Sequence, residues 1–195
     1  MGYALAEAAR KVSRKVTLVS GPTTLKPPRG VKFFAVETAS QMAKIVLRRA
    51  RYADIVIMAA AVADYRPAKT ASQKIKKSSR TLTVRLVPTL DIAAALGKRK
   101  RPNQILVGFA AETQNLLANA RKKIAAKNLD LIVANRIGRI GSGFASDTNE
   151  IVFIGRDGRS SKRIRGTKKK LARLIVSMAI SACCREKSQA NGNAI

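Results

Sequence analysis

The chain has 195 residues, 46% of them hydrophobic, so it can bury one core without support from a metal or a disulfide. Lysine and arginine number 39 against 11 aspartate and glutamate residues, and the resulting formal charge of +28 favours an anionic partner such as a nucleotide, a phosphorylated metabolite or nucleic acid. No apolar run reaches the ~20 residues that span a bilayer, no signal-peptide pattern opens the chain, and the neighbouring Cys183 and Cys184 are poorly placed to form a disulfide with each other. We therefore expect a soluble protein of the cytoplasm with no membrane partner.

Helices and strands alternate along most of the chain. In order, the sequence predicts a helix at 3–12, strands at 15–22 and 31–36, and a helix that Thr38 caps and that continues through about residue 52. A strand at 54–60, a long basic loop, a strand at 81–87 and a helix entered by Asp91 follow. The next elements are a strand at 104–110, a helix at 114–127 and a strand at 129–135. Most of these strands are apolar throughout, as in a parallel sheet covered on both faces. Because α/β folds normally open with a strand, the order also predicts that a first strand is missing.

The C-terminal part has a different pattern. A hairpin is predicted around Asp157 and Gly158, and an amphipathic helix at 168–184 follows it. The predicted fold class is α/β, a Rossmann-like three-layer fold with a mainly parallel sheet and a C-terminal hairpin plus helix. We expect a single domain over 1–184 and a polar, disordered tail over 185–195.

The candidate site lies after the strand at 54–60, because ligands of such sheets bind at the carboxyl ends of the strands. Asp64 could hold the magnesium ion that accompanies a nucleoside triphosphate, or it could simply cap its loop. The lysines of the following loop could close over phosphates, or belong to a solvated basic loop: Lys74, Lys76 and Lys77.

A second pair of cations lies on the helix predicted at 114–127. Lys123 and Lys127 are four residues apart, so they share one helix face and could meet one anion, although an ordinary solvated face has the same pattern. The chain has no histidine, which excludes histidine acid–base catalysis and histidine metal sites. Any enzyme of this composition would depend on electrostatics and positioning, which suits phosphoryl or nucleotidyl transfer.

Six motifs, in this order and at these distances, resemble the phosphopantothenoylcysteine synthetase family, the synthetase half of the bacterial coenzyme A biosynthesis flavoprotein. They are VTLVSGP, AAAVADYRP followed by KIKK, PTLDI, LVGFAAET, KIAAKNLDLIVAN and GFASDTNEI. The resemblance covers roughly residues 2–154. It implies a ligase that activates the carboxylate of 4′-phosphopantothenate with CTP, releases pyrophosphate, and then lets the amine of L-cysteine displace CMP from the acyl-cytidylate.

The resemblance also implies roles for individual residues. Asp64 corresponds to the nucleotide and Mg²⁺ contact, and Lys74 to the lysine that converts the acyl-cytidylate to product. The remaining residues of the implied CTP site are Met58, Ala59, Ala60, Leu90, Asp91, Ile92, Ala93, Phe109, Lys123 and Lys127, and Asn135 ends the third strand of the site. The family further implies a homodimer in which the segment at 61–87 pairs across a two-fold axis.

The chain also departs from the family pattern. Leu90 stands where the family has a proline, and Arg136 where it has an acid. The family's first strand, its glycine-bearing loop and an asparagine needed for acyl-cytidylate formation belong before Met1, so we expect CTP binding with little turnover from the chain starting there. No flavin is expected on this chain, and a separate flavin-dependent decarboxylase would be a partner. The alternative is a basic nucleic-acid-binding module on a degenerate nucleotide-site fold, although aromatic residues that could stack on bases make up only 4% of the chain.

Overall fold

The computed structural model describes residues 1–13, 15–77, 81–112, 116–136 and 148–192. In chain order its elements are α1 (Gly2–Val12), β1 (Thr17–Ser20), β2 (Lys32–Ala35), α2 (Ala39–Ala50), β3 (Ile55–Met58), β4 (Tyr65–Pro67), β5 (Leu86–Pro88), α3 (Ile92–Lys98), β6 (Ile105–Glu112), α4 (Leu116–Lys127), β7 (Leu131–Arg136), β8 (Thr148–Gly155), β9 (Ile164–Thr167) and α5 (Lys168–Gly192). None of the helices in these ranges is long and apolar enough to cross a membrane.

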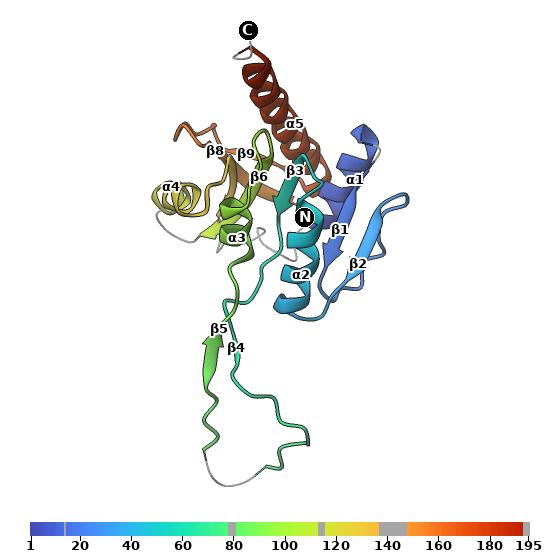
Figure 1. Cartoon of the computed structure of the whole chain (residues 1–195), viewed down its shortest axis with the longest axis vertical. Helices are drawn as coiled ribbons and strands as arrows, with labels where there is room; N and C mark the ends of the chain where they lie inside the picture. Colours follow the sequence, from blue (N-terminus) through green and yellow to red (C-terminus); the bar gives the residue numbers. More distant parts are fainter. Residues whose placement is uncertain (14, 78–80, 113–115, 137–147, 193–195) are drawn as a thin grey trace.

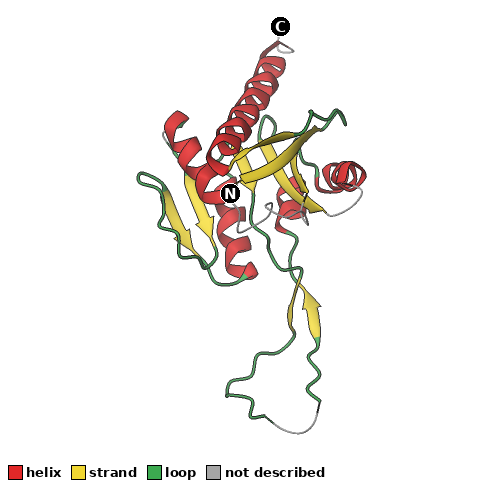
Figure 2. Cartoon of the chain, turned by 180° about the vertical axis from the view of Figure 1, so that it is seen from behind, coloured by secondary structure: helices red, strands yellow, loops and turns green. Residues whose placement is uncertain are grey.

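A five-stranded sheet forms the centre of the molecule, in the order β3-β6-β7-β8-β9. Strands β3, β6 and β7 are parallel, while β8 and β9 are antiparallel to their neighbours. A separate parallel pair, β1 and β2, lies beside this sheet, and the antiparallel pair β4 and β5 forms the base of a long arm that projects from the body (Figures 1 and 2).

Helices cover both faces of the central sheet, which gives three layers. One hydrophobic cluster joins the sheet to α2, α3 and α4 and includes Leu106, Ile132 and Ile154. The other joins it to α1 and α5 and includes Val107 and Val133. These strands alternate between the two clusters, so both faces of the sheet are apolar, as the uniform strand sequences predicted. The expected Rossmann-like three-layer α/β class is confirmed.

Two polar side chains fix the amino-terminal edge of the sheet. Asp130, just before β7, accepts a hydrogen bond from the Leu106 amide at 2.8 Å and binds the Lys100 ammonium at 2.6 Å. Buried Gln104 donates to the carbonyl oxygens of Ala50 and Ala53, both at 2.6 Å. These bonds anchor β6 to the ends of α2 and β7 and help to set the strand register.

Two elements differ from the sequence predictions. The strand predicted at 81–87 is reduced to β5, and it pairs with β4 in the arm rather than with the central sheet. The tail expected to be disordered from Arg185 instead continues α5 as far as Gly192, and its Lys187 binds Asp54 at 3.2 Å. The helix continues because neither glycine nor proline interrupts residues 185–190.

Candidate functional site at the carboxyl ends of the parallel strands

The carboxyl ends of β3, β6 and β7 lie side by side. The register places Met58 beside Gly108, and Ala111 beside Asn135. Because the three strands are parallel, the loops that follow them leave from the same edge of the sheet, as the sequence predicted. Small residues such as Ala59 and Ala60 follow β3 there, so main-chain groups can come close to a ligand.

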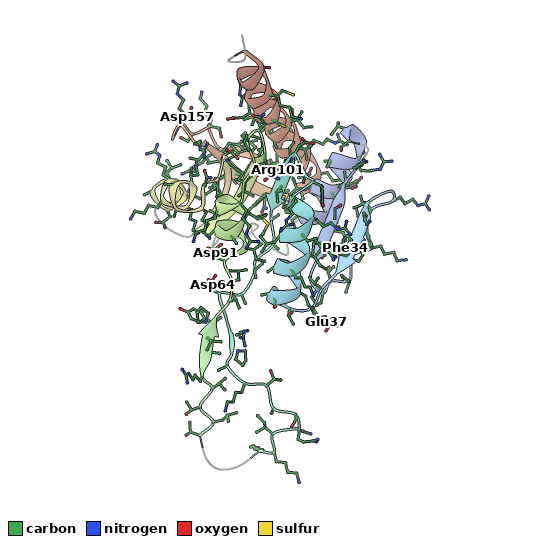
Figure 3. The ribbon with its side chains drawn as sticks, in the orientation of Figure 1. Phe34, Glu37, Asp64, Asp91, Arg101 and Asp157 are labelled. Carbon is green, nitrogen blue, oxygen red and sulfur yellow. The ribbon has the colours of Figure 1, made fainter. Side chains whose placement is uncertain are left out.

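The base of the arm is fastened to the start of α3. Thr89 donates its amide to the Asp64 carbonyl at 2.8 Å and its hydroxyl to the Ala63 carbonyl at 2.5 Å. These two bonds hold Asp64 close to Leu90 and Asp91, and Figure 3 shows the two aspartates near each other below α3. Asp64 itself is exposed to solvent. The structure therefore brings together three residues that the sequence predicted for one site.

Asp91 has two roles in this structure. Its side chain caps α3 by accepting from the Ala94 amide at 3.0 Å, as predicted, and it binds the Lys127 ammonium at 2.8 Å. Partial burial alone would raise the pKa of Asp91, but the hydrogen bonds from Lys127 and from the Ala94 backbone outweigh it, so its pKa lies below its ordinary value. Asp91 is therefore ionised at neutral pH and keeps Lys127 at the site.

Lys123 and Lys127 occupy one helix face, as their spacing predicted, but they are not two solvated cations. Lys127 pairs with Asp91, and Lys123 is half buried. A triphosphate reaching Lys127 would have to compete with the Asp91 carboxylate or bind beside it. Phe109, in β6, is also half buried and packs with the cluster that faces α1 and α5.

Lys74 lies in the segment between β4 and β5, beyond the paired base of the arm. Figure 1 shows this segment extending away from the body of the molecule. The structure therefore does not bring Lys74 together with Asp64 of the same chain. Lys76 and Lys77 belong to the same exposed segment.

The residues near Asp64 are compatible with magnesium only if a phosphate contributes ligands. No group of three or more Cys, Asp or Glu side chains within the described ranges could hold a metal alone. Asp64 has no ion pair to any described residue, so its carboxylate is available, whereas Asp91 is engaged by Lys127. One carboxylate with phosphate oxygens and water is a usual Mg²⁺ environment.

Two residues near this edge escaped the sequence analysis. Thr89 fastens the arm, and its role depends on a contact across 25 residues of chain that no local pattern reveals. Asn149 is only 8% exposed, and its side-chain oxygen has no hydrogen-bond partner. Asn135 also has a buried oxygen without a partner. Asn135 lies opposite Ile151 in the antiparallel register, and Asn149 is two residues from Ile151 on the same strand. Because residues two apart in a strand point to the same face, both asparagines lie on one face of the sheet.

Fold and site together define the class of the protein: a Rossmann-like α/β protein whose polar residues gather on loops after parallel strands, where such folds bind nucleotides. A family model described as the DNA/pantothenate metabolism flavoprotein C-terminal domain matches residues 1–182. The chain belongs to this family.

Individual relatives agree with this assignment. The chain is 49% identical over 159 residues to the coenzyme A biosynthesis bifunctional protein CoaBC of Bacillus subtilis, covering 81% of this chain and 39% of that relative. It is 44% identical over 177 residues to a cysteine/cysteine sulfinic acid decarboxylase of an unknown prokaryotic organism, covering 90% and 49%. The chain thus spans half or less of the length of these curated relatives.

Among solved structures, the chain is similar to the C-terminal domain of coenzyme A biosynthesis bifunctional protein CoaBC. The TM-score is 0.74 at 35% identity, and the match covers 97% of this chain and 82% of the other. This likeness supports the synthetase interpretation, and none of these relatives supports the nucleic-acid-binding alternative.

Proposed function

We propose that the chain is a phosphopantothenate–cysteine ligase of coenzyme A biosynthesis. The observation that carries the proposal is the match of nearly the whole chain, in sequence and fold, to the C-terminal domain of CoaBC. The arrangement at the strand ends supports it, because the available carboxylate of Asp64 and the lysines of α4 suit a nucleoside triphosphate with Mg²⁺. CTP, 4′-phosphopantothenate and L-cysteine are the proposed substrates.

In the first step, a carboxylate oxygen of 4′-phosphopantothenate attacks the α-phosphorus of CTP, and the bond to pyrophosphate breaks. Lys127 and Lys123 would balance the triphosphate charge, while Met58, Ala59 and Ala60 would line the nucleotide with backbone groups. Asp64 would hold Mg²⁺, which neutralises phosphate charge when bound. In the second step, the amine of cysteine attacks the acyl carbon, loses a proton, and CMP leaves.

We further propose that two copies of the chain complete each other's sites. Several large hydrophobic residues of the arm are exposed, including Ile75 at 63%, Leu82 at 65% and Leu86 at 55%. Such exposure on a projecting segment is typical of a surface that another chain covers. The arm's direction away from its own body would carry Lys74 to the site of the second copy (Figure 1).

We also propose that the enzyme works in the cytoplasm. Cys183 and Cys184 are free thiols, which suits a reducing compartment.

The proposal is tested by incubating excess protein with CTP, Mg²⁺, 4′-phosphopantothenate and L-cysteine and following the products by mass spectrometry. Excess protein lets slow turnover register. We expect pyrophosphate, CMP and an amide of phosphopantothenate with cysteine. Carbon dioxide release from cysteine without CTP, and no amide product, would instead favour the activity of the decarboxylase relative.

A further inference from the structure

A cavity lies away from the strand-end site. It has a volume of about 980 Å³ and lies between α1, the loop that follows β1, and the first turn of α5. We call it the α1 groove. Six of its twelve lining residues are lysine or arginine, compared with 39 of 195 in the whole chain, and only Glu7 is acidic. Its cations are Arg10, Lys11, Lys26, Arg29, Lys168 and Lys169. None of these residues belongs to the proposed CTP site.

Four of the six cations of the α1 groove have no counter-ion among the described residues. No carboxylate of a described residue lies within ion-pair distance of Arg10, Lys11, Lys26 or Arg29, whereas several lysines elsewhere are paired with aspartates. Converging positive charges repel one another, and an anion bound among them would relieve that repulsion. The groove therefore favours an anionic ligand.

The Arg10 side chain contacts the segment that precedes β2 and its own helix end. Its guanidinium lies against Gly30, where an added Cβ atom would come within 2.7 Å of Nε, and it donates to the Ser13 carbonyl at 3.3 Å. Gly30 has a φ of +75°, which glycine adopts readily. Arg29, which precedes Gly30, also lines the groove, and guanidinium groups suit phosphate oxygens.

The rest of the groove is partly apolar. Leu25 is 58% exposed there, Ala4 and Pro28 also line it, and the hydroxyl of Tyr3 is buried without a hydrogen-bond partner. Tyr3 and Arg10 are seven residues apart on α1, or roughly 10 Å along the helix axis.

We propose that the α1 groove binds a phosphate ester with an apolar or aromatic body. The phosphate lies at Arg10 and Arg29, and the body lies along Leu25 and Pro28 toward Tyr3. This is a second ligand site, independent of the proposed ligase chemistry.

The experiment titrates the protein with phenyl phosphate, inorganic phosphate and phenol at constant ionic strength, followed by NMR of the ¹⁵N-labelled chain. We expect phenyl phosphate to bind more tightly than either fragment and to shift the amide signals of α1 and residues 25–30. Arg10→Gln with Arg29→Gln should weaken phenyl phosphate binding about tenfold or more, since hydrogen bonds to charged groups contribute roughly 1.5–3 kcal/mol.

A matched control removes the same charge elsewhere. Lys162→Gln with Arg185→Gln, at exposed positions, should leave the affinity unchanged. Lys26→Gln should weaken binding without disturbing the packing of Arg10 on Gly30, and CTP binding should persist in all these variants. Equal loss in the groove and control variants, or phenyl phosphate binding no better than inorganic phosphate, would overturn the proposal by showing a general charge effect.

Discussion

At the scale of single residues, Lys100 and Asp130 form a close and largely buried ion pair, with 2.6 Å between the ammonium and the carboxylate. Their side chains are only 11% and 9% exposed, and Asp130 also accepts from the Leu106 amide. Asp130→Asn would leave the largely buried Lys100 ammonium without its carboxylate partner. We expect the free energy of unfolding to fall by about 3–5 kcal/mol, measured by chemical denaturation.

An exposed pair provides the control for that measurement. Asp157 and Arg159 lie 3.6 Å apart but are 58% and 91% exposed, so Asp157→Asn should cost less than about 1 kcal/mol. Equal effects of the two substitutions would show that burial does not decide the strength of these pairs.

The pair of Asp91 and Lys127 predicts a pH dependence. The pKa of Asp91 is lowered in the folded chain, so its contribution to stability is present above its unfolded pKa and is lost as the pH falls through its folded pKa. Asp91→Asn keeps the helix cap but removes the charge. We expect it to lower stability at pH 7 by about 0.2–1 kcal/mol, with the difference shrinking below about pH 3.9.

Thermal unfolding of both proteins between pH 2 and 7 measures this difference. Lys127→Met should show the same loss at neutral pH, because it removes the same ion pair. A gap between wild type and Asp91→Asn that stays constant down to pH 2 would contradict the assignment.

At the scale of elements, the contact of α3 with the end of α4 depends on Gly97. A Cβ atom there would lie 1.9 Å from the Lys127 carbonyl oxygen, and Asn128 donates to the Gly97 carbonyl at 2.9 Å. Because the obstacle is backbone, Gly97→Ala must separate the two helices, and we expect a loss of about 1–3 kcal/mol in unfolding free energy. Gly21→Ala is the control, since its nearest neighbouring atom is 4.0 Å away.

The elements differ in how far the sequence could predict them. Thr38 and Asp91 were predicted as helix caps, and both are confirmed, because capping depends on residues within one turn. The sequence TLTVRLV at 81–87 has strand propensity, yet only its last two residues pair, together with the following Pro88, since β4 is three residues long. The continuation of α5 was missed because the polar composition of the tail outweighed its helix-forming residues in the prediction.

The candidate site also contains some features that the sequence could predict and others that it could not. The common edge of β3, β6 and β7 follows from βαβ alternation, so the strand-end residues could be predicted. The contact of Thr89 with Asp64 and the pair of Asp91 with Lys127 depend on tertiary packing between distant segments. Residue 113 of the motif LVGFAAET and residues 143–147 of the motif GFASDTNEI lie outside the described residues.

At the scale of the whole molecule, the arm predicts that catalysis needs two copies. If Lys74 acts on the partner's site, neither Lys74→Gln nor Asp64→Ala should be active alone, but mixing the two variants under exchange should restore about a quarter of the wild-type rate, because half of the dimers are mixed and each has one intact site. No recovery, with mixed dimers present by native mass spectrometry, would place both residues in the same chain's site.

Isothermal titration of CTP in Mg²⁺ measures whether the sheet edge that carries Asp64 is a CTP site. We expect the wild-type chain to bind CTP, and Asp64→Ala to bind it about tenfold or more weakly at an unchanged unfolding temperature. Lys162→Gln should bind CTP as the wild type does. Absence of CTP binding at millimolar concentration, or equal affinity of the wild type and Asp64→Ala, would contradict a CTP site at this edge.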